Sequence, residues 1–104
     1  MMRFDQGLFA RMMAKTKIED RGHALGPCWV WQGAKVRGHG KIKIAGQLRY
    51  VHRAAWEVCK GEIPHALVLD HCCRTRDCWR PSHVEPVTAI ENTKRGAAAR
   101  RAAL

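Results

Sequence analysis

The period of the hydrophobic residues changes along the chain, and each period predicts a different element. Over residues 1–20, apolar residues recur at helical spacing opposite a basic set, which predicts a short amphipathic helix that packs on the rest of the chain. The apolar set is Phe4, Leu8, Phe9, Met12 and Met13, and the basic set is Arg3, Arg11 and Lys15. Residues 21–27 hold two glycines and a proline and are expected to form a linker.

A strand is expected to begin with residues 28–31, and a strict alternation follows over residues 35–44. Odd positions hold Lys35, Arg37, His39, Lys41 and Lys43, and even positions hold Val36, Gly38, Gly40, Ile42 and Ile44. Because successive side chains of a strand point to opposite faces, the pattern predicts one basic and one apolar face. After a turn over residues 45–47, a return strand is expected to place Leu48 and Tyr50 on one face and Gln47 and Arg49 on the other.

The middle of the chain predicts a helix and then a strand. Residues 52–59 are expected to form a short helix that stops at Gly61 and turns Trp56 and Cys59 inward. The apolar run over residues 66–69 predicts a short buried strand, which presents the two polar residues that follow it.

A capping box predicts the start of a C-terminal helix. The Thr88 hydroxyl can cap the amide of Glu91, whose carboxylate can reach back, so Asn92 is expected in the first turn or two of this helix. The elements together predict an α+β fold. We expect residues 1–22 to form an N-terminal helix and linker, and residues 23–104 to form the remainder of a single small domain.

Composition limits how such a chain can be stabilised. A chain of 104 residues buries a limited apolar core, and small domains are often held together by a disulfide or a metal. Charged residues interrupt the apolar runs of the first 22 residues, which argues against a signal peptide, and no segment approaches the roughly 18 apolar residues of a membrane span. We therefore expect a cytoplasmic, reducing compartment, where clustered cysteine and histidine indicate metal.

The net charge predicts a polyanionic partner. The formal charge of +10 is spread along the chain and indicates nucleic acid, although charge alone does not separate a nuclease from a protein that only binds RNA or DNA. A two-stranded ribbon with one basic face fits the major groove of DNA, and the alternative is a solvated hairpin face. The candidate DNA contacts are Lys35, Arg37, His39, Lys41, Lys43 and Arg49.

Two cysteines and a histidine near the C-terminal third have the spacing of zinc ligands. Cys73, Cys78 and His83 lie within eleven residues, and Cys28 at the head of the first strand is expected to complete a tetrahedral set. Cys72 competes with Cys73, but adjacent residues of an extended loop point in opposite directions, and the spacing favours Cys73. The alternative is a set of buried free thiols.

Three residues around the zinc motif have the chemistry of a hydrolytic site. The Asp70 carboxylate and the Asn92 amide oxygen would make a hard oxygen site for Mg²⁺, and His71 could take a proton from water. The plainer alternative is a hydrogen-bonded polar histidine and a solvated asparagine.

In the order and spacing of its motifs, the chain resembles the HNH endonucleases, and within them the zinc-containing branch shared with the His-Cys box homing endonucleases. The motifs are Cys28-Trp29-Val30-Trp31-Gln32-Gly33, Gly38-His39-Gly40, His52-Arg53-Ala54-Ala55-Trp56, Gly61-Glu62-Ile63-Pro64, Asp70-His71-Cys72-Cys73, Cys78-Trp79-Arg80-Pro81-Ser82-His83 and Glu91-Asn92. The similarity runs over residues 4–96 and implies the small fold called ββα-metal.

The resemblance implies a role for each matching residue. His71 matches the general base, while Asp70 and Asn92 match the ligands of a catalytic divalent metal, Mg²⁺ or Mn²⁺. The residues that match the structural zinc ligands are Cys28, Cys73, Cys78 and His83.

Three further positions are less settled by the resemblance. Arg53 matches an arginine that follows a histidine, and both a phosphate contact and a structural salt bridge stay open for it. Arg80 stands where the family usually has an asparagine that braces the loop, and His39 stands where it often has a tyrosine.

The sequence thus predicts a metal-dependent DNA endonuclease of the HNH type that acts on double-stranded DNA. The alternative is a non-catalytic, zinc-stabilised DNA-binding module. Twelve residues follow Asn92, mostly alanine and arginine, so we expect a monomer rather than a dimer. The resemblance is to small phage and bacterial proteins, and it leaves homing, phage packaging and host defence equally open.

Overall fold

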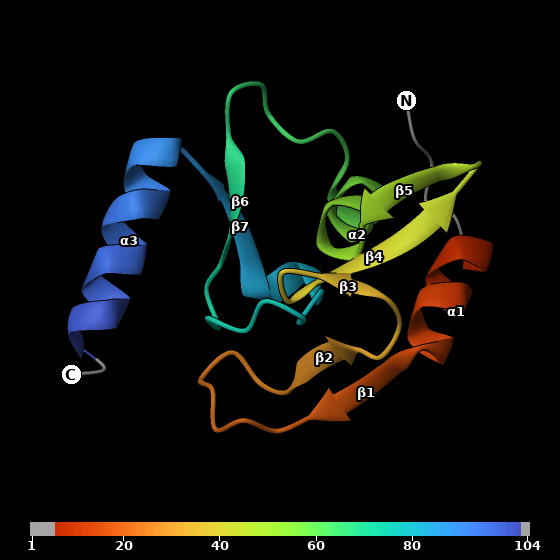
Figure 1. Ribbon diagram of the computed structural model, residues 1–104, viewed down its shortest axis with the longest axis horizontal. Helices are drawn as coiled ribbons and strands as arrows, with labels where there is room; N and C mark the ends of the chain where they lie inside the picture. Colours follow the sequence, from red (N-terminus) through yellow and green to blue (C-terminus); the bar gives the residue numbers. More distant parts are fainter. Residues whose placement is uncertain (1–5, 103–104) are drawn as a thin grey trace.

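Short helices and strands follow one another along the chain (Figure 1). The computed structural model describes residues 6–102, and the side chains of residues 7–99. In chain order the elements are α1 (Gln6–Ala14), β1 (Thr16–Glu19), β2 (Cys28–Trp31), β3 (Lys35–Val36), β4 (His39–Ile44), β5 (Gln47–Tyr50), α2 (Val51–Lys60), β6 (Val68–His71), the 3-10 turn η1 (Pro81–His83), β7 (Val84–Val87) and α3 (Ala89–Ala102). The predicted α+β class is confirmed; Arg3 and Phe4 of the expected first helix lie outside the described residues.

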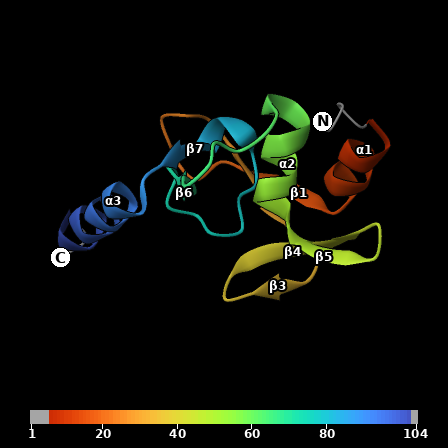
Figure 2. The same ribbon diagram turned by 90° about the horizontal axis from the view of Figure 1, so that it is seen from above.

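Within residues 6–102 the strands form three small antiparallel sheets, β1–β2, β3–β4–β5 and β6–β7. Viewed from above, α3 projects from the end that carries β6 and β7, while α1 lies at the opposite end beyond α2 (Figure 2). The order β6–β7–α3 is the ββα unit that the resemblance implied. None of the described helices is long and apolar enough to cross a membrane.

An apolar core joins the N-terminal helix to the middle of the chain. Its buried residues are Leu8, Met12, Trp31, Ile42, Val51, Ala55, Val58 and Trp79. Phe9 and Met13 pack against this set, so the expected packing of the amphipathic helix is confirmed. The core therefore fixes α2 and β4, two elements that carry polar residues toward the site described below.

A close approach between β4 and β2 makes a glycine necessary at position 40. Trp31 is 1% exposed, and its indole Nε1 donates to the Ala34 carbonyl at 3.1 Å. A Cβ atom built on Gly40 would lie 2.7 Å from Trp31 Cδ1, which is closer than carbon atoms pack. Gly40 lets β4 lie directly against the buried indole.

The alternating segment forms two strands instead of one. A turn at Arg37 (φ 54°) and Gly38 (φ 85°) separates β3 from β4, so the predicted two-stranded ribbon is a three-stranded sheet. The period of two holds within β4, where Gly40 and Ile42 are buried while Lys41 and Lys43 are more exposed. The glycine after Arg37 permits the reversal because it adopts a positive φ without a Cβ clash.

The predicted faces of the return strand, β5, are confirmed only in part. Tyr50 lies opposite Lys41, and Leu48 lies opposite Lys43, so both share the lysine face of the sheet. Leu48 is 59% exposed and does not continue the apolar face. Arg49 lies opposite Ile42 and therefore points to the other side from the lysines.

Three features of the fold were not predicted or were predicted wrongly. The strand β1 replaces the end of the expected N-terminal helix and pairs with β2, placing Thr16 opposite Trp31. The strand β7 pairs with β6, placing Val84 opposite His71. Cys59, expected to turn inward, is exposed because the buried side of α2 carries Val51, Ala55 and Val58 instead.

The C-terminal helix begins where the capping box predicted. The Glu91 amide donates to the Thr88 hydroxyl oxygen at 3.1 Å. The Glu91 carboxylate accepts a hydrogen bond from Arg95 Nε at 3.1 Å, rather than reaching back as the capping box would have it. Asn92 lies in the first turn of α3, as expected.

Gly40→Ala tests the close packing of β4 on Trp31. We expect the added methyl to destabilise the domain by roughly 1–3 kcal/mol, the usual effect of overpacking. Thermal unfolding should show a melting temperature lowered by several degrees. Leu48→Ala on the neighbouring strand is the control, because its side chain is exposed; equal effects for both variants would contradict the packing explanation.

Candidate functional site

Three cysteines and one histidine meet in the interior. Cys28 begins β2, Cys73 and Cys78 lie in the segment between β6 and η1, and His83 ends η1. Their candidate ligand atoms all lie within 4.8 Å of one another, and all four residues are buried. The structure thus brings together the four residues proposed from their spacing, and this cluster could hold a zinc ion.

The His83 ring has the orientation that a metal ligand needs. Its Nδ1 lies 3.6 Å from Cys28 Sγ and 3.5 Å from Cys78 Sγ. Its Nε2 lies 3.1 Å from the Leu25 carbonyl, which can only accept, so Nε2 carries the proton and the Nδ1 lone pair faces the sulfurs. Sulfur at about 2.3 Å and nitrogen at about 2.0 Å from a tetrahedral zinc would be about 3.5 Å apart. The observed spacing matches that value.

Without a bound cation, only one of the three thiols of the cluster is stabilised as a thiolate. The hydrogen bond between Cys78 and Cys73 lowers the pKa of Cys73 and raises the pKa of Cys78. Burial raises the pKa of Cys28. One thiolate is therefore stabilised by its neighbours, whereas three thiolates in this buried space require a bound cation.

Cys72 lies outside the cluster, as expected from the choice of Cys73 as the metal ligand. It is half-buried, and its backbone amide donates to the His83 carbonyl at 2.7 Å. This hydrogen bond ties the segment after β6 to the end of η1. Cys73 is then left to point toward Cys28 and Cys78.

Arg80 braces the loop at the position where the resemblance leads us to expect an asparagine. Its guanidinium donates to the Pro27 carbonyl at 2.9 Å and lies 5.3 Å from the centre of the Trp29 ring. The Trp79 amide donates to the Trp29 carbonyl at 3.0 Å. The loop that carries Cys78 is therefore attached to the segment that carries Cys28 by backbone and side-chain contacts.

A cleft with a volume of about 670 Å³ lies beside this cluster. Its lining includes Asp70, His71 and Asn92, the three residues assigned to hydrolysis, together with Arg53. His39, His52, Arg74 and Arg76 also line it. The cleft is bounded by β4, α2, β6 and α3, so it gathers residues from widely separated parts of the chain.

Asp70 is buried and held by two arginines. Its side chain is 3% exposed, and its two oxygens lie 3.0 Å from Arg74 Nη1 and 3.3 Å from Arg95 Nη1. Hydrogen bonds from Arg95 to Glu85 and Glu91 raise the pKa of Arg95, which keeps its charge fixed. The charge of the Asp70 carboxylate is therefore already compensated by two guanidinium groups.

His71 is buried with one ring nitrogen unused. Burial, followed by the nearby His39, lowers the pKa of His71, so the neutral imidazole prevails at neutral pH. A hydrogen bond with the Cys78 backbone acts in the opposite direction. Among the described residues, the buried Nε2 atom of His71 has no hydrogen-bond partner.

Two further histidines adjoin His71, and sequence reasoning did not place them there. Burial and the proximity of His71 lower the pKa of His52 to about 3. His39 is half-buried, and burial followed by Arg76 lowers its pKa as well. His39 thus lines the cleft and favours the neutral form, and its predicted contact with DNA stays a prediction.

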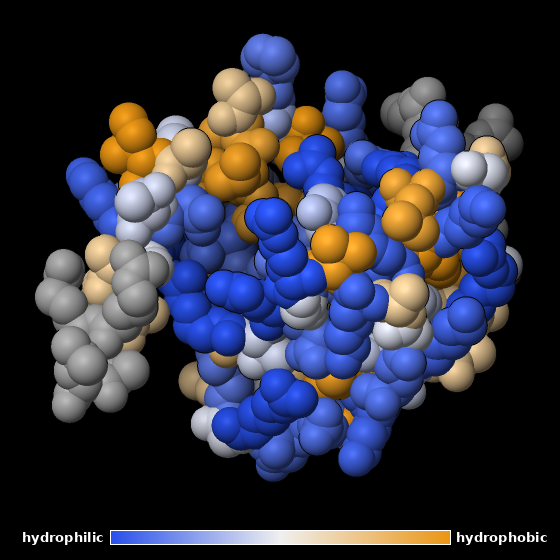
Figure 3. All heavy atoms as spheres, viewed as in Figure 1, coloured by the Kyte–Doolittle hydropathy of each residue, from blue (hydrophilic) through white to orange (hydrophobic). Residues whose placement is uncertain are grey.

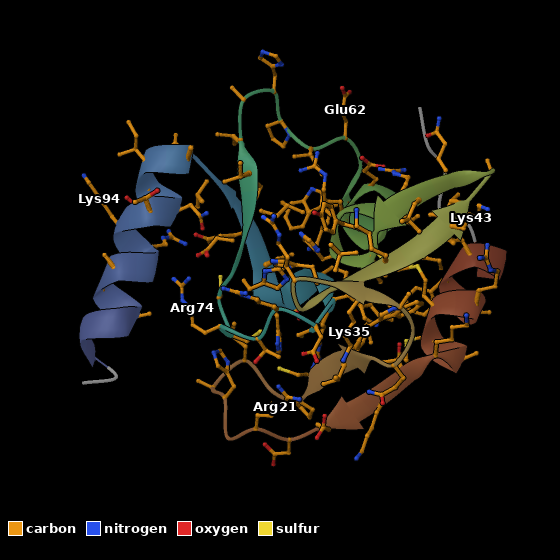
Figure 4. The ribbon with its side chains drawn as sticks, viewed as in Figure 1. Arg21, Lys35, Lys43, Glu62, Arg74 and Lys94 are labelled. Atoms are coloured by element: carbon orange, nitrogen blue, oxygen red, sulfur yellow. The ribbon has the colours of Figure 1, made fainter. Side chains whose placement is uncertain are left out.

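Three arginines of the cleft differ in how well they were predicted. Arg53 lines the cleft, and within the described part of the chain no salt bridge joins it to an acidic side chain; its predicted phosphate contact stays a prediction. Arg74 points into the space between α3 and the loop after β6 (Figure 4). Arg74 and Arg76 were missed, although their place just after the Asp70-His71 pair was a usable signal.

Tertiary contacts neutralise part of the predicted basic face. Lys35 donates to Asp77 at 3.0 Å, and Arg49 donates to Glu57 at 2.6 Å. The sequence holds no acid between residues 35 and 53, but folding brings acids from elsewhere. Arg49 lies on the opposite side of the sheet from the lysines, so its assignment to the basic face was wrong.

Lys41, Lys43 and Arg37 are the cationic residues of the face that stay free of acidic partners within the described residues. Lys43 and Arg37 are exposed, and the Lys41 ammonium lies 3.5 Å from the centre of the Tyr50 ring. Hydrophilic residues cover most of the face that carries β3, β4 and the loop after β6 (Figure 3). This face therefore keeps three cationic side chains that could contact a polyanion, fewer than the sequence pattern predicted.

Comparison with known proteins supports the resemblance seen in the motifs. Residues 49–94, from β5 into α3, match the family described as HNH endonuclease. Protein 7.7 of Escherichia phage T7 is 28% identical over 68 residues, which cover 64% of this chain and 52% of the phage protein. The chain thus spans about half the length of this relative. No solved structure matches the chain significantly.

Removing one cysteine of the cluster should remove its metal and unfold the domain. Zinc contributes on the order of 10 kcal/mol in small zinc domains, which is comparable with the whole stability of such a fold. For Cys78→Ser we expect loss of tightly bound zinc by elemental analysis and loss of cooperative thermal unfolding. Cys72→Ser and Cys59→Ser should keep both. A wild-type chain that stays folded after chelation would contradict a structural zinc.

Proposed function

Because residues 49–94 match the HNH endonucleases, we propose that this chain hydrolyses DNA phosphodiester bonds with His71 as the general base. The observation that carries the proposal is the unpartnered Nε2 of His71 in a cleft that Asp70, Asn92 and Arg53 also line. The cleft thereby combines a base, a pair of oxygen ligands and a free cation.

The residues of the cleft fit a divalent metal such as Mg²⁺ or Mn²⁺. A carboxylate and an amide oxygen, from Asp70 and Asn92, are hard ligands of the kind these ions prefer. The two guanidinium groups on Asp70 show that this position already balances positive charge. When bound, the ion would neutralise charge on the scissile phosphate and on the leaving 3′ oxygen.

His71 has the state that proton abstraction requires. Its burial favours the neutral imidazole, and the contact with the Cys78 backbone holds the ring beside the cysteine cluster. A water at the scissile phosphate could then pass a proton to the free Nε2. Arg53 and Arg76, on the walls of the cleft, would contact phosphates of the strand being cut.

The placement of Asp70 also defines what must move. Arg74 and Arg95 occupy both carboxylate oxygens, so metal ligation by Asp70 requires at least one guanidinium to leave. Incoming phosphates offer these arginines alternative partners of equal charge. Arg74, which is exposed, is the one free to exchange.

The same ion pairs favour a second candidate function. If the two arginines keep Asp70, the chain would be a zinc-stabilised module that binds DNA without cutting it. Incubation with supercoiled plasmid and Mg²⁺ or Mn²⁺, with and without EDTA, separates the two functions. Cleavage that EDTA abolishes supports the nuclease, and intact plasmid in every lane supports the binding module.

One chain carries one set of Asp70, His71 and Asn92, and one set cuts one phosphodiester bond at a time. We therefore propose a monomer that nicks one strand of double-stranded DNA before the other. Open circular plasmid would precede linear plasmid in a time course. A dimer by light scattering that yields linear DNA directly would contradict this.

His71→Ala should separate binding from cleavage. The substitution removes the base but leaves the cysteine cluster and the basic face, so DNA affinity should survive while the cleavage rate falls by about 10² or more. Plasmid nicking and fluorescence anisotropy measure the two properties. His65→Ala, in an exposed loop, is the matched control. A His71→Ala variant that cleaves at the wild-type rate would place the base elsewhere.

Replacing Lys41 and Lys43 by alanine should weaken DNA binding and flatten its dependence on salt. Each lost phosphate contact should reduce the slope of log affinity against log salt by about one unit. Lys35→Ala should change the slope less, because its ammonium is already paired with Asp77. An unchanged slope in the double variant would shift the main contact to the basic residues of α3.

A further inference from the structure

Three histidines from three separate elements converge on one wall of the cleft. His39 comes from β4, His52 from α2 and His71 from β6, and their candidate ligand atoms lie within 4.8 Å of one another. The ring centres of His52 and His71 are 4.6 Å apart, and that of His39 is 5.5 Å and 5.4 Å from them. None of the four cysteine-cluster residues belongs to this group.

Two nitrogens of this histidine cluster are buried without a partner. Among the described residues, neither His39 Nδ1 nor His71 Nε2 has a hydrogen-bond partner. Buried polar atoms are almost always hydrogen-bonded, so two such atoms in neighbouring rings indicate a missing partner. Both atoms belong to imidazoles close enough to bind the same ion.

We propose that His39, His52 and His71 bind one transition-metal ion, such as Zn²⁺, Ni²⁺ or Co²⁺, at a second site separate from the cysteine cluster. Imidazole suits these ions and not Mg²⁺, which prefers oxygen. Three protein nitrogens leave a fourth position open toward the cleft, where water can enter.

An ion at this site would occupy the atom that the proposed reaction needs. His71 Nε2 is the free nitrogen, and it cannot accept a proton while it ligates a metal. This consequence rests on the proposed function, whereas the metal site itself does not. We therefore expect transition-metal ions to inhibit cleavage supported by Mg²⁺, with the same concentration dependence as their binding.

The test uses the full chain with its cysteine cluster already loaded with zinc, and Ni²⁺ as the probe. Isothermal titration calorimetry of the wild type should show one Ni²⁺ per chain, with no thiolate-to-nickel absorption. His39→Phe keeps the ring volume and removes one ligand, and should weaken binding at least tenfold. His65→Ala should bind as the wild type does, because His65 is exposed and is not a member of the histidine cluster.

A second measurement protects the test against a misfolded variant. Zinc content and circular dichroism show whether His39→Phe keeps the fold. In the wild type, ¹⁵N spectra of the histidine rings during addition of Zn²⁺ should shift the signals of His39, His52 and His71 and leave His65 unchanged. A wild type without saturable Ni²⁺ binding, or a folded His39→Phe with undiminished binding, would overturn the site.

Plasmid cleavage by the same samples separates this site from the proposed function. If Ni²⁺ binds as expected but cleavage with Mg²⁺ continues at the full rate, the metal site stands and His71 is not the base. If His71→Ala abolishes cleavage but the wild type binds no Ni²⁺, the nuclease stands and the histidine site is wrong.

Discussion

The convergence of three buried sulfurs and one imidazole is the constraint on which the site depends. Cys28 lies 45 residues before Cys73 in the sequence, yet their sulfurs share one small space with Cys78 and His83. The segment between β6 and η1 contains little regular structure of its own. Holding that segment to β2 fixes the connection between β6 and β7, and with it the strand that carries Asp70 and His71.

Charge holds the other side of the cleft. The helix α3 carries Asn92, and Arg95 on the same helix pairs with Asp70 of β6 and with Glu85 of β7. The Arg95 side chain is 33% exposed, so each of these pairs contributes modestly in water. One wall of the cleft is therefore fixed by a buried cluster, and the other by exchangeable ion pairs. Such a wall can adjust when a polyanion enters.

On the basic surface, tertiary contacts change which of the predicted cationic side chains stay unpaired. The alternation correctly predicted that Lys41 and Lys43 lie on one face of β4 and Ile42 on the other face. It could not anticipate that Asp77 would reach Lys35 or that Glu57 would reach Arg49, since those acids lie at distant positions. Nor could it show that His39 leaves the surface for the cleft, where burial suppresses its charge.

The sequence alone determined the features that local spacing controls. The α+β class, the glycine that ends α2, the start of α3 at Thr88 and the membership of Cys73 in its cluster all follow from short-range patterns of side-chain direction and capping. Only the tertiary structure decided the pairing of β1 with β2 and of β7 with β6, because short strands depend on partners distant in the chain. It also decided the ion pairs on Asp70 and the meeting of His39, His52 and His71. These contacts join residues whose sequence separations give no periodic signal, so burial and charge compensation in the folded chain select them.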